Sequence, residues 1–167
     1  LSPALWFKKI DSTLRGNVAA ELVAALAASG RQEMIVAPAV PAQGRTVVGG
    51  KVHVNGVPLE QTEFVHDAVS AASALPLSAQ LAAADPALVC RVVKAEPPAG
   101  EHRAWIADAA VDADLAAIAG WAMRRADTAL LAGAAGLGNA IAGALAPDAV
   151  SMPLPGAEAG PILTVLG

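Results

Sequence analysis

The sequence predicts an α/β fold, in which a mostly parallel sheet carries helices on both faces. Short apolar runs alternate with stretches of helical periodicity, as in chains whose strands are joined by crossover helices. Hydrophobic residues make up 55% of the 167 residues, yet there are only 3 Trp, 2 Phe and no Tyr. Such a core is built from small aliphatic side chains, which let helices pack closely on a sheet. One Asn-Gly pair, at 55–56, predicts an antiparallel hairpin.

The expected strands are the short apolar runs, at 5–10, 34–37, 88–93, 104–107, 129–132 and 162–166. The expected helices fill most of the intervals between them, at 18–28, 77–84, 112–125 and 137–145. Capping residues mark two of these helices. Asn17 and Gly30 flank the first, and Asp112 is the expected N-cap of the third, which ends on Arg124 and Arg125.

Residues 47–59 interrupt the alternation and are expected to form a projecting β-hairpin. Two short β-type runs flank Asn55 and Gly56, which is the pair that a tight type I′ turn prefers. Pro58 cannot donate a ladder hydrogen bond, so the ribbon should lie at a sheet edge or project from the body. A projecting ribbon could cover a binding site or pair with another subunit, which leaves a homo-oligomer open.

The distribution of charge favours a small anionic ligand. The formal net charge is −4, but residues 1–59 carry six basic and three acidic side chains, and the acidic excess falls in 60–167. The basic part is the part that holds the motifs described below, as an anionic substrate requires. No run of Lys or Arg exceeds a pair and no aromatic residues interleave with them, so a nucleic-acid partner is not expected.

Three further classes are disfavoured. Cys90 is the single cysteine and cannot form an internal disulfide, which fits a cytoplasmic protein. Residues 128–147 are uncharged over a length that would cross a bilayer, but their four glycines favour a buried strand, a turn and a helix, so no membrane partner is expected. His53, His66 and His102 have no carboxylate or cysteine at ligand spacing, so no metal site is expected.

The most informative segment is 8–17, with the sequence KKIDSTLRGN. It follows an apolar strand-like run and precedes the first helical pattern, so it should be a polar turn at the positive end of a helix dipole. Cations, hydroxyls and one carboxylate gather there, and a helix start of this kind suits a carboxylate or phosphate. From the residues alone, a solvated loop with an ordinary N-cap is an equally good interpretation.

Residues 9–17 resemble the signature of the four-carbon acid sugar kinase family, in its N-terminal, sugar-binding domain. A second block, at 37–50, and its continuation through 54–59 to Asp67, is similar to the same family, and 130–137 is a weaker third. The resemblance implies an ATP-dependent kinase of a four-carbon sugar acid such as threonate, erythronate or 3-oxo-tetronate. ATP and magnesium would then be held mainly by a second, nucleotide-binding domain.

The resemblance also implies a domain division. Residues 1–151 would be the sugar-acid-binding domain without its upstream Asp-Asp-x-Thr-Gly motif, 152–160 a linker, and 161–167 the start of the nucleotide-binding domain. This piece alone is expected to be inactive. Two other functions stay open: a non-catalytic anion-binding regulatory module, and a fragment of a nucleotide-binding oxidoreductase that uses the late glycine loop.

A four-carbon sugar acid implies roles for the residues of the first block. Arg15 would hold the carboxylate as a fork donor, and Ser12 and Asn17 would bind hydroxyl groups. Lys9 would contact the carboxylate or a transferring phosphoryl oxygen. Asp11 would accept a hydrogen bond from a substrate hydroxyl or act as the base that deprotonates it. The alternative for Asp11 is a salt-bridged turn residue with a structural role.

Three more residues are candidates outside that block. Arg45 follows a strand end that is turned by glycine, and it could supply a second anion contact or tie its own loop down. Gly133 and Gly136 lie in a glycine loop after a strand, where they could cradle a phosphate of the nucleotide or serve only in packing. Asp67 is expected to be a loop or cap residue.

Overall fold

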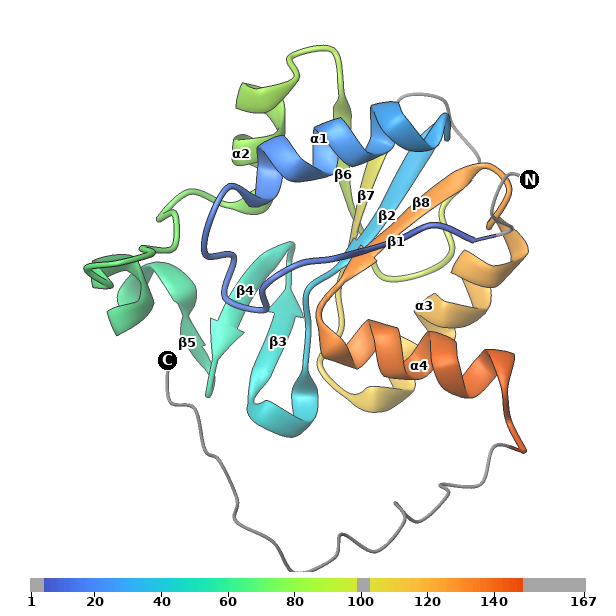
Figure 1. Ribbon diagram of the computed structural model, residues 1–167. Coiled ribbons are helices and arrows are strands. Elements are labelled where there is room, and N and C mark those ends of the chain that lie inside the picture. The colour runs from blue at the N-terminus through green and yellow to red at the C-terminus, as the bar shows by residue number, and fades with distance from the viewer. Residues whose placement is uncertain (1–4, 99–102, 149–167) are drawn as a thin grey trace, which may run out of the picture.

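The computed structural model describes residues 5–98 and 103–148 and confirms the α/β prediction (Figure 1). Its main sheet has five strands, all parallel, in the order β1-β8-β2-β7-β6. The strands are β1 (Phe7–Lys9), β8 (Ala129–Gly133), β2 (Glu33–Ala37), β7 (Arg103–Ala107) and β6 (Val89–Val93). The three central strands are buried along almost their whole length, as expected of a parallel sheet covered on both faces.

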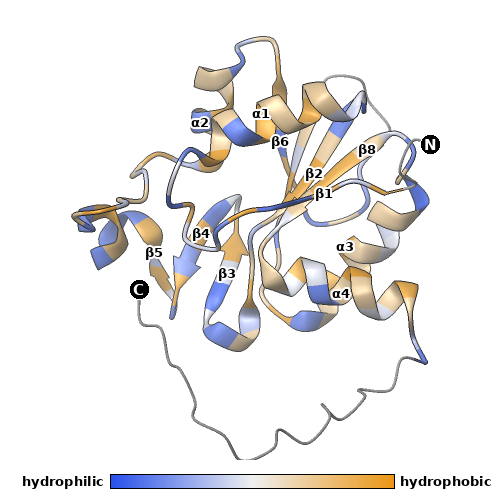
Figure 2. Cartoon of the chain, in the orientation of Figure 1, coloured by the Kyte–Doolittle hydropathy of each residue, from blue (hydrophilic) through white to orange (hydrophobic). Residues whose placement is uncertain are grey.

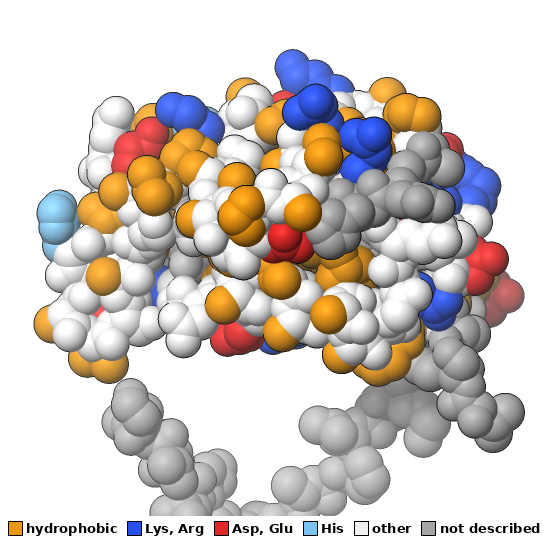
Figure 3. All heavy atoms as spheres, turned by 90° about the horizontal axis from the view of Figure 1, so that it is seen from above, with side chains coloured by type: hydrophobic (Ala, Val, Ile, Leu, Met, Phe, Trp, Pro, Cys, Tyr) orange, Lys and Arg blue, Asp and Glu red, His pale blue; other side chains and the backbone are white. Residues whose placement is uncertain are grey.

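Among the described residues, four α-helices cover this sheet, two on each face (Figure 1). One face carries α1 (Val18–Ser29) and α2 (Leu77–Ala84), and the other carries α3 (Asp112–Arg124) and α4 (Ala135–Leu145). Each helix turns leucines, isoleucines, valines or alanines toward the strands, and Figure 2 shows the apolar character of the strands between them. On the outer surface seen in Figure 3, apolar side chains are scattered among polar ones, which is ordinary for a protein surface.

Parallel pairing brings the carboxyl ends of all five strands to one edge of the sheet. Lys9 and Ala37 both pair with Gly133, and Val93 pairs with Ala107. The segments that follow these strands therefore gather at the carboxyl edge, where ligands of open α/β sheets bind. The segment 8–17, the loop after β2 and the start of α4 all lie at this edge.

A small antiparallel sheet lies beyond the carboxyl edge (Figure 1). It consists of β3 (Arg45–Val48), β4 (Lys51–Val54) and β5 (Val57–Pro58), in that order. Asn55 and Gly56 have φ of 50° and 81°, so the predicted I′-type turn is confirmed. Pro58 lies in an edge strand, as expected. The prediction missed β3, which a second turn of the same kind joins to β4.

The helices begin and end within two residues of the boundaries that the sequence predicts, but the capping groups differ. Gly30 ends α1 with φ of 65°, as predicted, whereas Asn17 occupies the N-cap position without a side-chain capping bond. Asp112 is not the N-cap of α3 but the first residue of the helix, and Val111 occupies the N-cap position. Asp114 does the capping instead, accepting hydrogen bonds from the N–H groups of Ala110 (2.8 Å) and Val111 (3.0 Å). The helix α4 begins at Ala135, two residues before the predicted start.

A buried polar cluster lies at the opposite, amino edge of the sheet. Glu33, the first residue of β2, is 1% exposed, and Arg125, just after α3, is 9% exposed. Glu33 accepts a hydrogen bond from Nη2 of Arg125 and one from Nε1 of Trp105 (2.7 Å). Arg125 also donates to the carbonyl groups of Pro97 (2.9 Å) and Pro98 (3.2 Å). The expected linker and the strand at 162–166 lie outside the described residues.

Candidate functional site

The segment after β1 forms a tight turn around the carboxylate of Asp11. Oδ2 of Asp11 accepts hydrogen bonds from the N–H of Thr13 (3.0 Å), the hydroxyl of Thr13 (2.6 Å) and the N–H of Arg15 (3.3 Å). Thr13 and Leu14 are buried, whereas Arg15 and Asn17 are exposed. The turn therefore exposes its later polar side chains while its apolar ones anchor it to the core.

Arg15 closes a fork on Asp11. Its Nε donates to Oδ2 (3.2 Å) and its Nη2 to Oδ1 (3.1 Å), a bidentate pair. The guanidinium also lies 5.9 Å from the ring centre of Phe64, and the Arg15 backbone pairs with Ala72. The Nε and Nη2 groups of Arg15 thus already bind a carboxylate of the protein. Of the three guanidinium nitrogens of Arg15, only Nη1 has no hydrogen-bond partner among the described residues.

The same contacts determine the chemistry of Asp11. Burial by itself raises the pKa of the Asp11 carboxyl, but hydrogen bonds from Arg15 and Thr13 outweigh burial and hold the pKa well below its usual range. A carboxylate that is so strongly stabilised is a weak proton acceptor. The geometry therefore favours a structural turn residue, one of the two interpretations open from the sequence, and the catalytic role stays a prediction.

Leu14 holds this turn in an unusual conformation. Its φ is +58° and its side chain is 3% exposed. A bulky residue rarely adopts a left-handed backbone, and such conformations persist only where the surroundings fix them. The side chain belongs to the core and lines a small hollow together with Val52, Leu59 and Leu77. The small sheet and α2 thus help to fix the conformation of the turn at residues 10–17.

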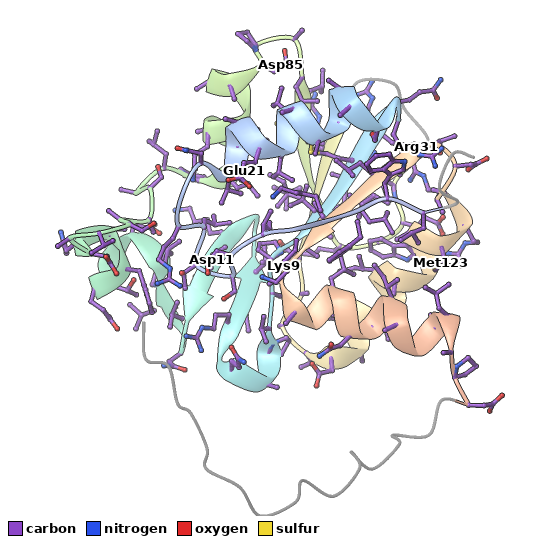
Figure 4. The ribbon with its side chains drawn as sticks, viewed as in Figure 1. Lys9, Asp11, Glu21, Arg31, Asp85 and Met123 are labelled. Atoms are coloured by element: carbon purple, nitrogen blue, oxygen red, sulfur yellow. The ribbon has the colours of Figure 1, made fainter. Side chains whose placement is uncertain are left out.

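The other predicted residues of the first block lie along the same segment (Figure 4). Lys9 ends β1, and its Nζ donates to the carbonyl of Ile10 (2.8 Å). Figure 4 shows Lys9 and Asp11 on the part of the chain that runs from β1 toward the small sheet. Ser12 is half-buried, and the exposed Asn17 makes no capping bond. Their roles toward a ligand stay predictions.

Arg45 begins β3 and lies half-buried beside the loop after β2. Its Nη1 donates to the carbonyl of Gln43 (2.7 Å), which corresponds to the predicted alternative of tying down its own loop. Its Nε is buried and has no hydrogen-bond partner among the described residues. The main chain of Arg45 pairs with Val40 in the loop after β2 (2.8 and 3.1 Å).

Gly133 and Gly136 are closely packed against the neighbouring loop. A Cβ on Gly133 would lie 2.6 Å from the carbonyl oxygen of Ala37, and one on Gly136 would meet Ala39 and, at 2.7 Å, Leu115. These contacts explain both glycines by packing, which was one of the two interpretations from the sequence. A hollow of about 340 Å³ lies beside Gly136, between the loop after β2 and the helices α3 and α4. Phosphate binding there stays a prediction.

Asp108 is a residue that the sequence analysis missed. It follows β7 at the carboxyl edge, and its two oxygens accept hydrogen bonds from the N–H groups of Gly49 and Gly50, both at 2.8 Å. The signal was present in the sequence: an acid directly after a buried strand, and a glycine pair between two β-type runs. What the sequence could not show is that these two segments meet.

Residues 5–98 and 103–148 contain neither a metal-binding cluster nor a membrane-spanning helix. No group of three or more His, Cys, Asp or Glu side chains in these ranges is arranged to hold a metal ion. No helix in them combines the length and the apolar character needed to cross a bilayer. The 128–147 segment is accounted for by β8 and α4.

Known proteins resemble this chain in both sequence and structure. A D-threonate kinase from Salmonella typhimurium is 39% identical over 153 residues, which cover 84% of this chain and 36% of the relative. A D-threonate kinase from Cupriavidus necator is 38% identical over 174 residues, which cover 96% of this chain and 41% of the relative. The chain thus spans well under half the length of these curated relatives.

A solved structure shares the fold. It is a crystal structure of a Bordetella bronchiseptica protein, described as a domain of unknown function with bound citrate and as a domain-swapped dimer. It superposes with a TM-score of 0.71 at 29% identity, over 84% of this chain and 37% of that chain. The family described as "Sugar-binding N-terminal domain" matches residues 2–141. Since this match covers most of the sequence, the chain belongs to the family of sugar-binding N-terminal domains.

Proposed function

We propose that this domain binds a four-carbon sugar acid and holds it for phosphorylation by the whole protein, which would be a kinase. The observation that carries the proposal is the match to the sugar-binding domain family over residues 2–141. The names of the two relatives above make D-threonate the first substrate to test, with erythronate and 3-oxo-tetronate as alternatives.

The chemistry of the carboxyl edge supports an anionic ligand. A sugar acid offers one carboxylate and several hydroxyl groups. Cationic donors come from the end of β1 (Lys9), the turn after it (Arg15) and the start of β3 (Arg45). Arg45 is half-buried, and its Nη2 has no hydrogen-bond partner among the described residues. The citrate that is bound to the Bordetella protein is likewise a carboxylate ligand.

In this proposal, Arg45 and the remaining Nη1 of Arg15 bind the carboxylate, while Ser12 and Asn17 bind hydroxyl groups. Asp11 shapes the turn and accepts at most a hydrogen bond, because its low pKa makes it a poor base. Lys9 contacts the carboxylate or the transferring phosphoryl group. ATP and magnesium are held mainly by the rest of the protein, with Gly133 and Gly136 near the phosphates. The proposed location is the cytoplasm, and a homo-oligomer is the proposed assembly.

Melting of the whole protein tests the ligand class. Threonate, erythronate and the uncharged polyols threitol and erythritol are compared at matched ionic strength. A ligand at about ten times its dissociation constant stabilises the folded state by about 1.4 kcal/mol, which is a shift of a few degrees for a domain of this size. The acids should raise the melting temperature and the polyols should not. Equal shifts by acids and polyols, or no shift by any acid, would refute the anion site.

Two variants then test the residues. Arg45→Ala should weaken threonate binding roughly tenfold or more, since a charge-assisted hydrogen bond contributes about 1.5–3 kcal/mol. Arg15→Ala should also weaken binding. Arg124→Ala is the matched control, because Arg124 is an exposed arginine that pairs with Glu96. Phosphorylation of threonate by the whole protein with ATP and magnesium completes the test.

A further inference from the structure

We propose that Asp108 is a positioning residue, which fixes Arg45 by clamping the turn between β3 and β4. This inference rests on the proposed function, because it takes Arg45 as a donor to the sugar acid. Asp108 itself touches no ligand in this proposal. Its role is to hold the small sheet at one distance from the carboxyl edge of the parallel sheet.

The clamp joins two segments that are far apart in the sequence. The backbone N–H of Asp108 donates to the carbonyl of Val93 (2.9 Å), so the residue is anchored between the ends of β7 and β6. Its carboxylate reaches the small sheet, with Oδ2 on the N–H of Gly49 and Oδ1 on the N–H of Gly50, both at 2.8 Å. A carboxylate that accepts two backbone hydrogen bonds in this way forms a strong, oriented contact.

The glycine turn is shaped for this contact. Gly49 and Gly50 have φ of +61° and +73°, which glycine adopts without the cost that other residues incur. A Cβ on Gly50 would clash with the side chain of Val92 on β6. The turn between β3 and β4 therefore packs against β6 of the main sheet, and the N–H groups of Gly49 and Gly50 face Asp108.

Strand β3 transmits this position to Arg45. One residue before the end of the strand, Val47 exchanges two backbone hydrogen bonds with Ala109, at 2.8 and 3.0 Å. Arg45, two residues earlier, pairs with Val40 in the loop after β2. The strand is thus held at one end by the loop after β2 and at the other by Asp108 and Ala109. Loss of the Asp108 contacts leaves the second end held by Ala109 alone, which loosens the strand that carries Arg45.

A small displacement of Arg45 is enough to weaken binding. Polar groups that recognise a ligand must be held within about 0.5 Å of the productive geometry. The Arg45 side chain is half-buried and its Nη1 donates to the carbonyl of Gln43, so the direction in which its Nη2 points depends on the position of β3. Asp108 therefore acts on the ligand through Arg45 and not through its own charge.

Asp114 provides a matched control for Asp108. It lies in the same region and also accepts two backbone hydrogen bonds, at 2.8 and 3.0 Å, but from Ala110 and Val111 at the start of its own helix. Asp108→Asn and Asp114→Asn therefore remove the same charge and disturb the same kind of contact. Only the first variant weakens a contact between the small sheet and the main sheet.

The test is a double-mutant cycle on the whole protein, with threonate binding measured by titration calorimetry and melting measured in parallel. Asp108→Asn should weaken threonate binding roughly tenfold, the effect of losing one charge-assisted contact. In an Arg45→Ala background it should cause no further loss of affinity, while its effect on the melting temperature should remain. Asp114→Asn should lower the melting temperature and leave the affinity unchanged. Gly50→Ala breaks the clamp from its other side and should reproduce the affinity loss, and it carries the test if Asp108→Asn does not fold.

The outcomes separate this inference from the proposed function. If Arg45→Ala weakens binding but Asp108→Asn and Gly50→Ala do not, the clamp has no positioning role and the proposed function stands. If the losses of Asp108→Asn and Arg45→Ala simply add, Asp108 does not act through Arg45. If Arg45→Ala has no effect on threonate binding, Arg45 is not a donor to the sugar acid, and this inference is overturned with that assignment.

Discussion

Replacing Arg125 by Ala should destabilise the domain by about 3–5 kcal/mol, the usual cost of removing one partner from a buried ion pair. Arg125 is 9% exposed and pairs with Glu33, which is 1% exposed. Without the guanidinium, the buried Glu33 carboxylate would keep only the hydrogen bond from Trp105 among the described residues. The carbonyl groups of Pro97 and Pro98 would lose their donor as well.

The expected loss is large on the scale of protein stability. Domains are typically stable by about 5–15 kcal/mol, so the variant would lose a substantial fraction of that margin. A domain of this size changes its melting temperature by about 2–4 °C per kcal/mol. The melting temperature should therefore fall by roughly 6–20 °C, and the midpoint of urea unfolding should fall without a change in slope.

The neighbouring residue gives the control. Arg124 pairs with Glu96 on the surface, and its side chain is 60% exposed. Arg124→Ala should cost no more than about 1 kcal/mol, because exposed ion pairs contribute little. Urea unfolding of the two variants beside the parent measures the difference. If Arg125→Ala costs no more than Arg124→Ala, the cluster around Glu33 does not stabilise the fold as argued.

Two other predictions concern the candidate site. The pKa of Asp11 is lowered in the folded chain, so its carboxylate stabilises the fold above about pH 4, and that contribution declines as the pH falls further. Asp11→Asn should therefore cost more stability at pH 7 than at pH 3 in urea unfolding, and an equal cost at both would contradict the assignment. Gly136→Ala should destabilise by about 1–3 kcal/mol, because its Cβ would meet Ala39 and Leu115. Gly143→Ala, in the same helix with nothing within 4 Å, should stabilise by up to about 1 kcal/mol, and similar melting shifts for both would refute the packing argument.

The elements that the sequence predicted well are those whose pattern is local. Helical periodicity located α1 and α2 to within a residue or so, and Asn55-Gly56 located a hairpin turn because both residues suit positive φ. The strand β3 was missed because its residues carry no clear alternation. The strand is followed by Gly49 and Gly50, and a glycine pair is equally typical of a flexible loop.

The rest of the site depends on contacts between distant segments. The pairing of Asp11 with Arg15 follows from an irregular turn with Leu14 at positive φ, which no periodic pattern encodes. Glu33 looks like a surface residue in the sequence, and it is buried only because Trp105 and Arg125 supply partners. The sheet order is also invisible in the sequence, since nothing local indicates that β8 lies between β1 and β2.

The place of β1 in the sheet has a consequence for how this chain folds during synthesis. Phe7 pairs with Leu131, so about 120 residues separate the two strands, and β1 pairs with no other strand in the described part of the chain. A ribosome releases β1 and α1 long before β8 has been made, and β1 must wait unpaired until then. Contacts of such long range slow folding. We therefore expect the turn at 10–17 to gain protection against hydrogen exchange among the last segments, after β2, β7 and β6 have already assembled.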